Sequence, residues 1–425
     1  MSKGISHFND FKVSGLWWFP EKPESQLLGT LSYSPKGDGF IRLTLYDNLQ
    51  DKNLHIDRDN IPNLLGFAEG KIYSCVAIEV WENPSHSEFC FRVRYIVQGQ
   101  HISEIEPLFQ ELKFESVGIL EYLSPTPDYT KIVKSNGKEY AFLPADNIEV
   151  DGVTFERKPT WKAHKRQFSA QGNVSLQILS KEENKPLDFF SSKAYRIRQL
   201  IDLLSGSIAP IEYIFIKDGN EFFPLLHGVM FDVDRVTESG FVSQPKKEFI
   251  RFQQIEGLFP QILETWLSIT EELKGTYHRL YRALRGNYIF FEDRFFSLSQ
   301  SLETLHTISN PLFKVCGNNS VFNARCMEML EMFHKKYPEL DKFNTHEWQV
   351  KLPEAKTLGD AADEITEFRN QFTHPIDKNT GKPKPRKETP AFLEKRLKVL
   401  LYVILFDRLG LPENLIQQFI QHHTS

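Results

Sequence analysis

The feature that most constrains the fold is a change in the spacing of apolar residues near residue 240. Before it, short runs alternate apolar with polar side chains, as in Phe40–Tyr46 and Phe89–Tyr95. This period of two is typical of strands with one buried face. After it, apolar residues recur every three or four positions, as in amphipathic helices. The sequence therefore predicts an α+β multidomain protein, with a β-rich region over residues 1–245 and an all-α bundle over residues 246–425.

Turn signals divide the β-rich region into short strands. Asn136-Gly137 and Asp218-Gly219 are dipeptides that favour tight turns, and the first predicts a hairpin between its flanking strands. One segment departs from the pattern, because apolar residues at helical spacing run from Phe190 to Leu204 and stop at Gly206. We expect a single helix there, packed on the strands.

The second region predicts about four long helices. Thr357 and Asp360 resemble a capping box at the start of the third. Gly410-Leu-Pro412 is a stop signal for the fourth, so His422 and His423 are interpreted as a frayed tail. The predicted helices cover residues 288–305, 326–337, 357–374 and 393–410, after a helical connector at 247–285.

An arginine interrupts the apolar stripe of the third helix. Arg369 takes the place in that stripe between Ile365 and Phe372. A buried unpaired guanidinium costs several kcal/mol, so Arg369 needs a partner or a cleft. His374 follows five residues later, and Pro375 disfavours helical geometry at His374, which places the imidazole at the helix end. The two side chains can converge on one cleft, or Arg369 can pair with a bundle glutamate while His374 caps the helix.

The segment after this helix is locally basic. Residues 377–390 carry five cations against two acids, a net charge of +3 in a chain whose formal charge is −5. Such a segment suits a polyphosphate backbone, although a solvated surface loop has the same composition. The five cations are Lys378, Lys382, Lys384, Arg386 and Lys387.

Several classes of protein are disfavoured. No HExxH, P-loop or GxSxG motif occurs, and the four cysteines form no CxxC pair. The acids Asp360, Asp363, Glu364 and Glu367 could hold Mg²⁺, but at this spacing a solvated helix face is favoured. We therefore expect no metal and no cofactor. The first ten residues lack an apolar core and no apolar run approaches ~20 residues, so we expect a cytoplasmic protein without leader or membrane span.

Two motifs resemble a known family. Arg369-Asn370-Gln-Phe-Thr-His374 resembles the R-polar-x-x-x-H signature of HEPN-domain ribonucleases. Gly15-Leu-Trp-Trp-Phe-Pro20, followed by Gly29-Thr-Leu31, resembles the start of ApeA-type HEPN anti-phage proteins. The resemblance implies a C-terminal HEPN bundle that acts as a metal-independent RNA endonuclease in abortive infection. It also implies a homodimer, or a larger homo-oligomer, in which two copies of the motif face one composite cleft.

The resemblance also implies roles for the residues. His374 would transfer protons, Arg369 would brace the anionic phosphorane, and Asn370 would orient the phosphate or the histidine. The products would be a 2′,3′-cyclic phosphate and a 5′-hydroxyl, with tRNA as the suggested substrate. The basic segment would bind RNA. The β-rich region would sense a phage-derived trigger or restrain the nuclease.

Two other functions fit the same sequence. The bundle could be a dimerisation module, with the basic segment holding RNA without cutting it. Alternatively, the β-rich region could bind a carbohydrate or nucleotide that the helices only assemble around. The cluster Trp17-Trp18-Phe19 is interpreted as core, with a contact surface for a phage product as its alternative.

Overall fold

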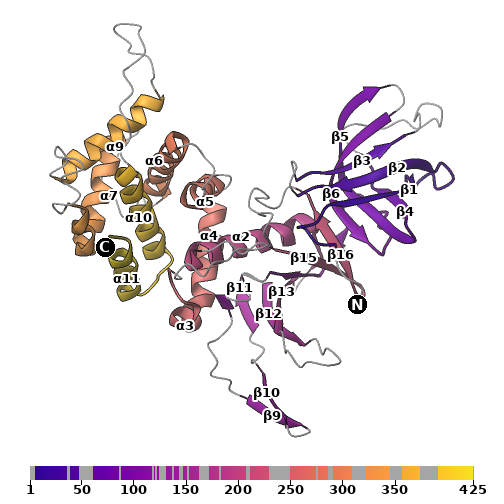
Figure 1. The fold of residues 1–425 in the computed structure, drawn as a ribbon, viewed down its shortest axis with the longest axis horizontal. Helices are drawn as coiled ribbons and strands as arrows, with labels where there is room; N and C mark the ends of the chain where they lie inside the picture. Colours follow the sequence, from indigo (N-terminus) through magenta and orange to yellow (C-terminus); the bar gives the residue numbers. More distant parts are fainter. Residues whose placement is uncertain are drawn as a thin grey trace. The chain divides into compact units, whose positions relative to one another are not determined.

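The computed structural model of the chain divides into two compact units, residues 1–253 and 254–425. It describes residues 5–35, 39–46, 61–85, 88–116, 119, 122–123, 131–135, 138–142, 147–150, 153–161, 172–180, 183–206, 211–228, 249–273, 276–285, 291–308, 322–344, 357–373 and 391–424. The first unit is β-rich and the second helical (Figure 1), which confirms the predicted fold class. The boundary predicted between residues 245 and 246 stays a prediction, because residues 229–248 lie outside the described ones.

The start of the first unit is a closed antiparallel barrel. Its strands follow the order β6-β3-β2-β1-β4-β5, and β5 pairs with β6 to complete the ring. The apolar residues that alternate along these strands fill the interior, so the period of two seen in the sequence becomes one buried face for each strand. The barrel strands are β1 (Phe11–Trp18), β2 (Leu27–Tyr33), β3 (Ile41–Leu45), β4 (Leu64–Ala68), β5 (Lys71–Ser85) and β6 (Glu88–Gln98).

Glycines on three neighbouring barrel strands leave room for close strand contacts and for the indole of Trp17. Gly15 lies opposite Gly29 on β2 and Ala68 on β4, where a Cβ would overlap the neighbouring backbone. A Cβ at Gly66 would overlap the Trp17 indole, whose Nε1 donates to the Gly29 carbonyl at 3.2 Å. Trp17 is fully buried, which confirms its prediction as core.

Strand β6 also belongs to a second group of strands. Beyond the barrel the sheet continues in the order β6-β16-β15-β8-β13-β12-β11 (Figure 1). Separate two-stranded pairs are β9 with β10 and β7 with β14. These strands are β7 (Leu108–Phe109), β8 (Glu111–Glu115), β9 (Lys131–Ser135), β10 (Lys138–Phe142), β11 (Asn147–Val150), β12 (Val153–Trp161), β13 (Gly172–Ser180), β14 (Lys185–Pro186), β15 (Tyr213–Asp218) and β16 (Glu221–His227).

The predicted hairpin between β9 and β10 and the predicted helix are present, and the turn signal Asp218-Gly219 joins a second hairpin, β15 with β16. Ser135 pairs with Lys138 and Asp218 pairs with Glu221, so both loops have two residues. Helix α2 (Leu187–Ser205) contacts β8, β13 and β14, and it ends at Gly206 in the left-handed conformation, as the sequence indicates.

The second unit is a group of helices around α6. Helix α6 contacts α4, α5, α7, α9 and α10. In α10, residues 399–406 are all buried, so this part of the helix is surrounded by the rest of the unit. The elements are α3 (Phe252–Ile255), whose first two residues fall in the first unit, η2 (Glu256–Leu258), α4 (Phe259–Leu273), α5 (Tyr277–Arg285), α6 (Phe291–Ile308), α7 (Phe322–Lys336), η5 (Pro338–Asn344), α9 (Leu358–Thr373), α10 (Ala391–Arg408) and α11 (Glu413–Thr424).

The frayed tail expected at the C-terminus is wrong. His422 and His423 lie in α11, which buries Leu415, Ile416, Phe419 and Ile420. The His423 ring packs on Phe419 and its Nδ1 is 2.8 Å from the Phe419 carbonyl oxygen. Pro412 precedes α11 and its carbonyl accepts the Leu415 N–H, so Pro412 starts a helix as well as following one.

None of the described helices combines the length and hydropathy that a membrane crossing requires. The described cysteines Cys75, Cys90 and Cys326 are free thiols. Burial raises the pKa of the Cys326 thiol to about 12, and it raises the pKa of Cys75 further still. Cys75 and Cys326 therefore act as packing residues.

Candidate active site

Helix α9 carries the arginine that the sequence singles out, and its start is fixed by the predicted capping box. The Thr357 N–H donates to Asp360 Oδ2 at 2.7 Å, and the Asp360 N–H donates to Thr357 Oγ1 at 3.1 Å. These reciprocal bonds satisfy donors that a helix N-terminus otherwise leaves unpaired. The register of α9, and hence the direction of Arg369, is set from this end.

Arg369 lies at the edge of the apolar stripe and not within it. Of the α9 residues up to Asn370, for which burial is described, Ala361, Ala362, Ile365 and Phe368 are buried. Phe368 packs edge-to-face on Phe295 of α6, with ring centroids 6.1 Å apart. The apolar spacing predicts Arg369 at the stripe position, whereas Phe368 fills it, and the Arg369 side chain is 19% exposed.

Arg369 has two described contacts on neighbouring helices. Its Nη2 lies 3.0 Å from Glu303 Oε2 on α6. Its guanidinium carbon lies 4.5 Å from the centroid of the Phe322 ring on α7. The cation is held between the ring of Phe322 and the carboxylate of Glu303, and these two contacts restrict the positions that it can adopt. The pairing of Arg369 with a bundle glutamate is therefore observed, whereas the position of His374, on which both alternatives depend, lies outside the described residues.

The carboxylate of Glu303 is shared by two arginines. Arg325 Nη1 of α7 lies 3.1 Å from Glu303 Oε1, while Arg369 holds the other oxygen. Two guanidinium groups therefore bind one carboxylate where α6, α7 and α9 meet. All three side chains are partly exposed, at 19–32%, so an anionic group from solution can approach them.

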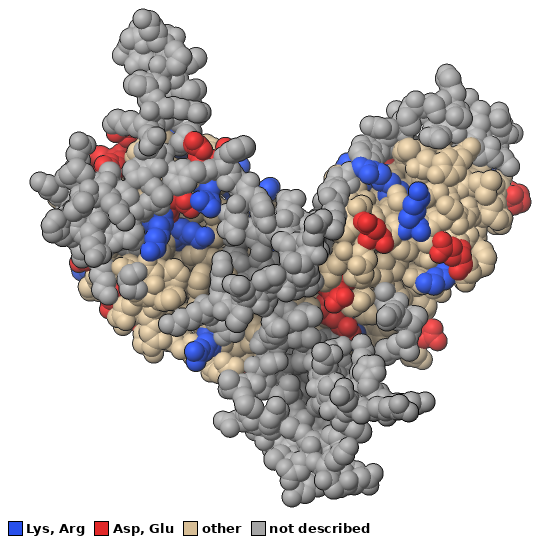
Figure 2. Space-filling model, viewed as in Figure 1, with Lys and Arg blue, Asp and Glu red and all other residues tan. Residues whose placement is uncertain are grey.

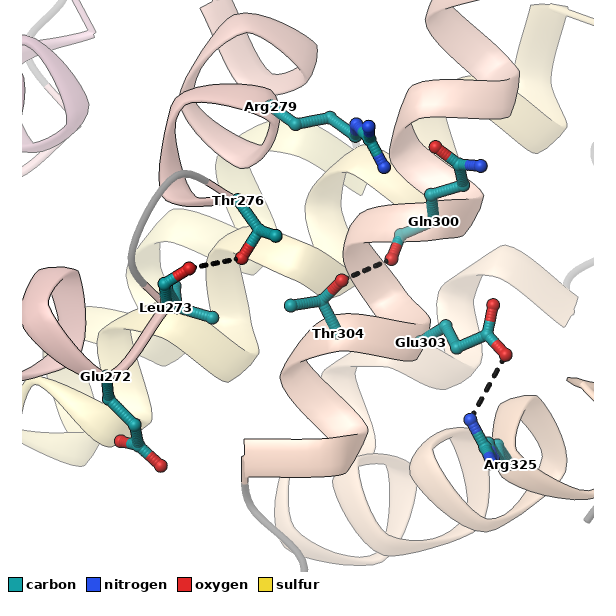
Figure 3. A pocket seen from close by; sticks show the side chains of 8 residues that line it. All are labelled: Glu272, Leu273, Thr276, Arg279, Gln300, Glu303, Thr304 and Arg325. Atoms are coloured by element: carbon teal, nitrogen blue, oxygen red, sulfur yellow. Dashed lines mark hydrogen bonds and ion pairs between the residues drawn. The ribbon is translucent and has the colours of Figure 1, made fainter. Parts of the chain in front are cut away.

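A cavity of about 400 Å³ adjoins this cluster, with Glu303 and Arg325 in its wall. Figure 3 shows Arg279 of α5 extending toward Gln300 of α6, and Glu303 turned toward Arg325 below. The Thr276 and Thr304 hydroxyls line it too, donating to the Leu273 and Gln300 carbonyls at 2.7 and 2.9 Å. The lining residues are Glu272, Leu273, Thr276, Arg279, Gln300, Glu303, Thr304 and Arg325.

The chemistry of this lining favours a polar ligand with an anionic part. Arg279 and Arg325 place guanidiniums in the wall, and Arg369 adds a third cation behind Glu303. Glu272 and Glu303 offset part of that charge, so the cavity suits a phosphodiester better than a dense polyanion. On the face that Figure 2 shows, the described Lys and Arg side chains lie among Asp and Glu side chains, consistent with a net charge of −5.

Most of the other predicted site residues lie outside the described ones. Asn370 is in α9 beside Arg369 and is half-buried. His374 and the basic residues Lys378, Lys382, Lys384, Arg386 and Lys387 are not described. The convergence of Arg369 and His374 on one cleft, and the role of the basic segment, therefore stay predictions.

Two described histidines of the helical unit are engaged by carboxylates. His306 Nε2 lies 2.9 Å from Glu328 Oε2, and His334 Nδ1 lies 2.7 Å from Asp341 Oδ1. Both are buried, and burial lowers the pKa of His334 below its ordinary value. Neither lines the cavity.

Two of the acids of α9 have described hydrogen bonds, one within the helix cap and one to α7. Asp360 belongs to the cap, and Asp363 accepts a hydrogen bond from Asn323 Nδ2 at 2.5 Å. Within the part of the chain that is described, no three His, Cys, Asp or Glu side chains are placed to hold a metal ion.

Comparison with known proteins identifies the first part of the chain. The family model ApeA N-terminal domain 1 matches residues 12–266, more than half of the 425 residues. No curated protein and no solved structure matches the chain. The match includes the glycine-tryptophan motif of the barrel and ends within α4, before the Arg369 cluster. Through this domain, the chain belongs to the ApeA family of anti-phage proteins.

Proposed function

We propose that the helical unit is a metal-independent RNA endonuclease and that the protein defends its host by cutting RNA, with tRNA as the suggested target. Arg369 stabilises the reacting phosphate and His374 transfers a proton. Asn370 orients either the phosphate or the His374 imidazole. The family match supports anti-phage defence, and the Arg369 cluster supports the chemistry. The proposal places the protein in the cytoplasm, with RNA as its partner.

The observation that carries the proposal is the geometry of Arg369. Its guanidinium is oriented by Glu303 and Phe322, beside a cavity whose wall includes Arg279 and Arg325. A guanidinium that is fixed before substrate arrives stabilises developing negative charge without reorganisation during the reaction. Arg325, held by the same carboxylate, is then a second phosphate contact.

Cleavage without a metal requires two proton transfers. The RNA 2′-hydroxyl loses a proton to a base, and its oxygen attacks the adjacent phosphorus. The bond to the 5′-oxygen breaks, and this oxygen takes up a proton from an acid, leaving a 2′,3′-cyclic phosphate and a 5′-hydroxyl. In the proposal His374 performs one transfer and the His374 of a second protomer the other, so a homodimer is part of the mechanism.

A cleavage assay tests the proposal directly. Purified protein is incubated with tRNA and total RNA in EDTA, with and without phage lysate, and the new RNA ends are analysed. We expect cyclic-phosphate ends from the natural protein, and a loss of about 100-fold or more in rate for Arg369→Ala and His374→Ala. Arg282→Ala is the matched control, because Arg282 is an exposed arginine of α5 outside the cavity. Equal cleavage by all three variants would refute the assignment.

The cavity has its own matched pair of variants. Arg279 and Arg282 lie on the same helix, but only Arg279 lines the cavity. We expect Arg279→Gln to weaken RNA binding and to lower its salt dependence, since one phosphate contact is lost. Arg282→Gln should change neither quantity. Equal effects of the two variants would mean that the cavity is not on the RNA path.

The rival function is RNA binding without cleavage. The ion pair between Arg369 and Glu303 is compatible with this rival, because an arginine with a purely structural role would make the same contact. The two functions differ in the assay, because the rival predicts retained RNA binding with no new ends under any condition. If the rival is correct, Arg369→Ala would lower the free energy of unfolding, and no RNA cleavage would be seen with either the natural protein or the variant.

A further inference from the structure

A second cavity lies on the first unit, where strand β6 changes its partner. Residues Phe89–Val93 of β6 pair with β3, whereas Tyr95–Val97 pair with β16. Arg94 lies between these two sets, and its carbonyl accepts the Gly228 N–H at 2.9 Å. The sheet therefore divides at Arg94, with the barrel on one side and the outer strands on the other.

The opposite edge of β6 is irregular at the same level. On β5, the side chains of Tyr73 and Cys75 belong to the barrel core, and the next core side chain is that of Ile78. The alternation of core-facing and outward-facing residues therefore shifts by one position near Ala77. Ala77 has a φ of 53°, in the left-handed region that residues other than glycine rarely adopt. Strained backbone of this kind concentrates at functional sites. The shift leaves Ala77 and Glu79 exposed, near Arg92 and Arg94 of β6.

The cavity at this point has a volume of about 400 Å³, within the range of small-molecule sites. Two arginines and a carboxylate supply its charge. The Arg92 guanidinium carbon lies 3.7 Å from the Phe40 ring centroid, so this cation is held flat against an aromatic ring. Arg94 Nη1 is held by Asp188 Oδ2 of α2 at 2.8 Å, and its side chain is 51% exposed. The lining residues are Phe40, Ala77, Glu79, Arg92, Val93, Arg94, His227 and Gly228.

A buried histidine completes the lining. His227 is 6% exposed and its ring stacks on Tyr95, with centroids 4.4 Å apart. Its backbone N–H donates to Nε2 of His7, whose Nδ1 donates in turn to the Glu212 carbonyl. The Nδ1 of His227 is buried and has no hydrogen-bond partner among the described residues. Buried polar atoms are nearly always paired, so this nitrogen points to a ligand atom that completes it.

We propose that this cavity binds a nucleotide, with its phosphate at Arg92 and Arg94 and a polar edge of its base at His227 and Glu79. A small oxyanion such as phosphate fits this lining poorly. Glu79 would repel the anion, and the anion would fill only a small part of the cavity. A ligand with an anionic group and an uncharged heterocycle uses every polar group in the wall. This site lies in the first unit, so the proposal is independent of the RNA chemistry of the second.

The site is tested by calorimetric titration of the full-length protein. The probes are GMP, AMP, guanosine and inorganic phosphate. We expect at least one nucleotide to bind about tenfold or more tightly than guanosine or phosphate, since both ends of the ligand contribute. Binding of no nucleotide, or equal affinity for phosphate alone, would overturn the proposal.

Variants assign the binding to this cavity. Arg94→Gln should weaken nucleotide affinity about tenfold, because a charge-assisted contact is lost. Asp188→Asn breaks the same ion pair but keeps the Arg94 cation, so it should retain affinity. Lys71→Gln, at an exposed position of β5 outside the cavity, should behave as the natural protein does. If both Arg94→Gln and Asp188→Asn weaken nucleotide affinity equally, the loss comes from the broken ion pair to α2, and the proposed contact between Arg94 and the phosphate is refuted.

Discussion

The single carboxylate of Glu303 orients two arginines from different helices, Arg325 of α7 and Arg369 of α9. Exposed ion pairs contribute little stability, so Glu303→Gln should lower the free energy of unfolding by about 1 kcal/mol or less. Its effect on RNA should be larger. The substitution adds one net positive charge, so RNA binding should tighten and its logarithmic salt slope should steepen by roughly one. Cleavage should slow, because Arg369 loses the group that orients it.

The matched control is Glu331→Gln on α7. Glu331 is exposed and lies outside the cavity, so this variant changes the total charge equally without touching the cluster. Filter binding at several salt concentrations and the cleavage assay distinguish the two variants. Identical salt slopes in both would show that Glu303 does not act at the RNA site.

The buried His7 should make the free energy of unfolding of the first unit depend on pH. Burial lowers its pKa from 6.5 to about 4, while its hydrogen bond to the Glu212 carbonyl acts in the opposite direction. The unfolded chain binds this proton at higher pH than the folded chain does. Stability is therefore complete above pH ~6.5 and is lost as the pH falls toward ~4, by about 3 kcal/mol for this group. Urea unfolding at several pH values measures the slope.

The variant His7→Gln separates this group from others. Glutamine retains one donor and one acceptor but does not titrate, so the slope between pH 4 and 6.5 should become smaller. Burial and Arg94 also lower the pKa of His227, which should leave a residual slope. An unchanged slope in His7→Gln would contradict the prediction.

At the scale of elements, two glycines with left-handed backbone can be compared. Gly206 ends α2 with φ 70° and packs on Phe249, whereas Gly219 turns the β15–β16 hairpin with φ 57° and has no atoms near its Cβ position. Gly219→Ala should cost about 1 kcal/mol from the backbone alone. Gly206→Ala should cost more, because the methyl group must also displace Phe249. Thermal unfolding of the two variants measures the difference, and equal losses would show that Phe249 yields freely.

Elements with local signals could be predicted from the sequence. The Asp218-Gly219 hairpin, the stop of α2 at Gly206 and the Thr357 cap depend on residues within a few positions of one another, and all are observed. Helix α11 is not predicted, because Gly410-Leu-Pro412 indicates the end of α10 but gives no separate signal for the helix that follows. Phe368 was missed as a seam residue because the helical period allows either of two adjacent positions.

Long-range pairings could not be predicted in this way. Glu303 and Arg369 are far apart in the chain, and nothing near either residue indicates the other. No motif or apolar pattern in the sequence singles out Glu303 or Arg325. The closure of the barrel by β5 and β6 depends likewise on packing among distant strands.

For the whole molecule, the proposed mechanism requires two protomers. Specific activity should therefore rise with protein concentration over the range in which dimers form, since each cleft needs a group from the second copy. Sedimentation velocity and the cleavage assay should be carried out on the same dilution series. Full activity at concentrations where the protein is monomeric would contradict the shared cleft.

The double membership of β6 has a consequence for slow opening motions. Among the described strands, β6 is hydrogen-bonded to β5 along one edge and to β3 and then β16 along the other. Neither the ring nor the outer strands can separate without breaking bonds to it. Amide hydrogens in the middle of β6 should therefore be the last of the first unit to exchange with deuterium, and mass spectrometry of that peptide would report the global stability of the unit.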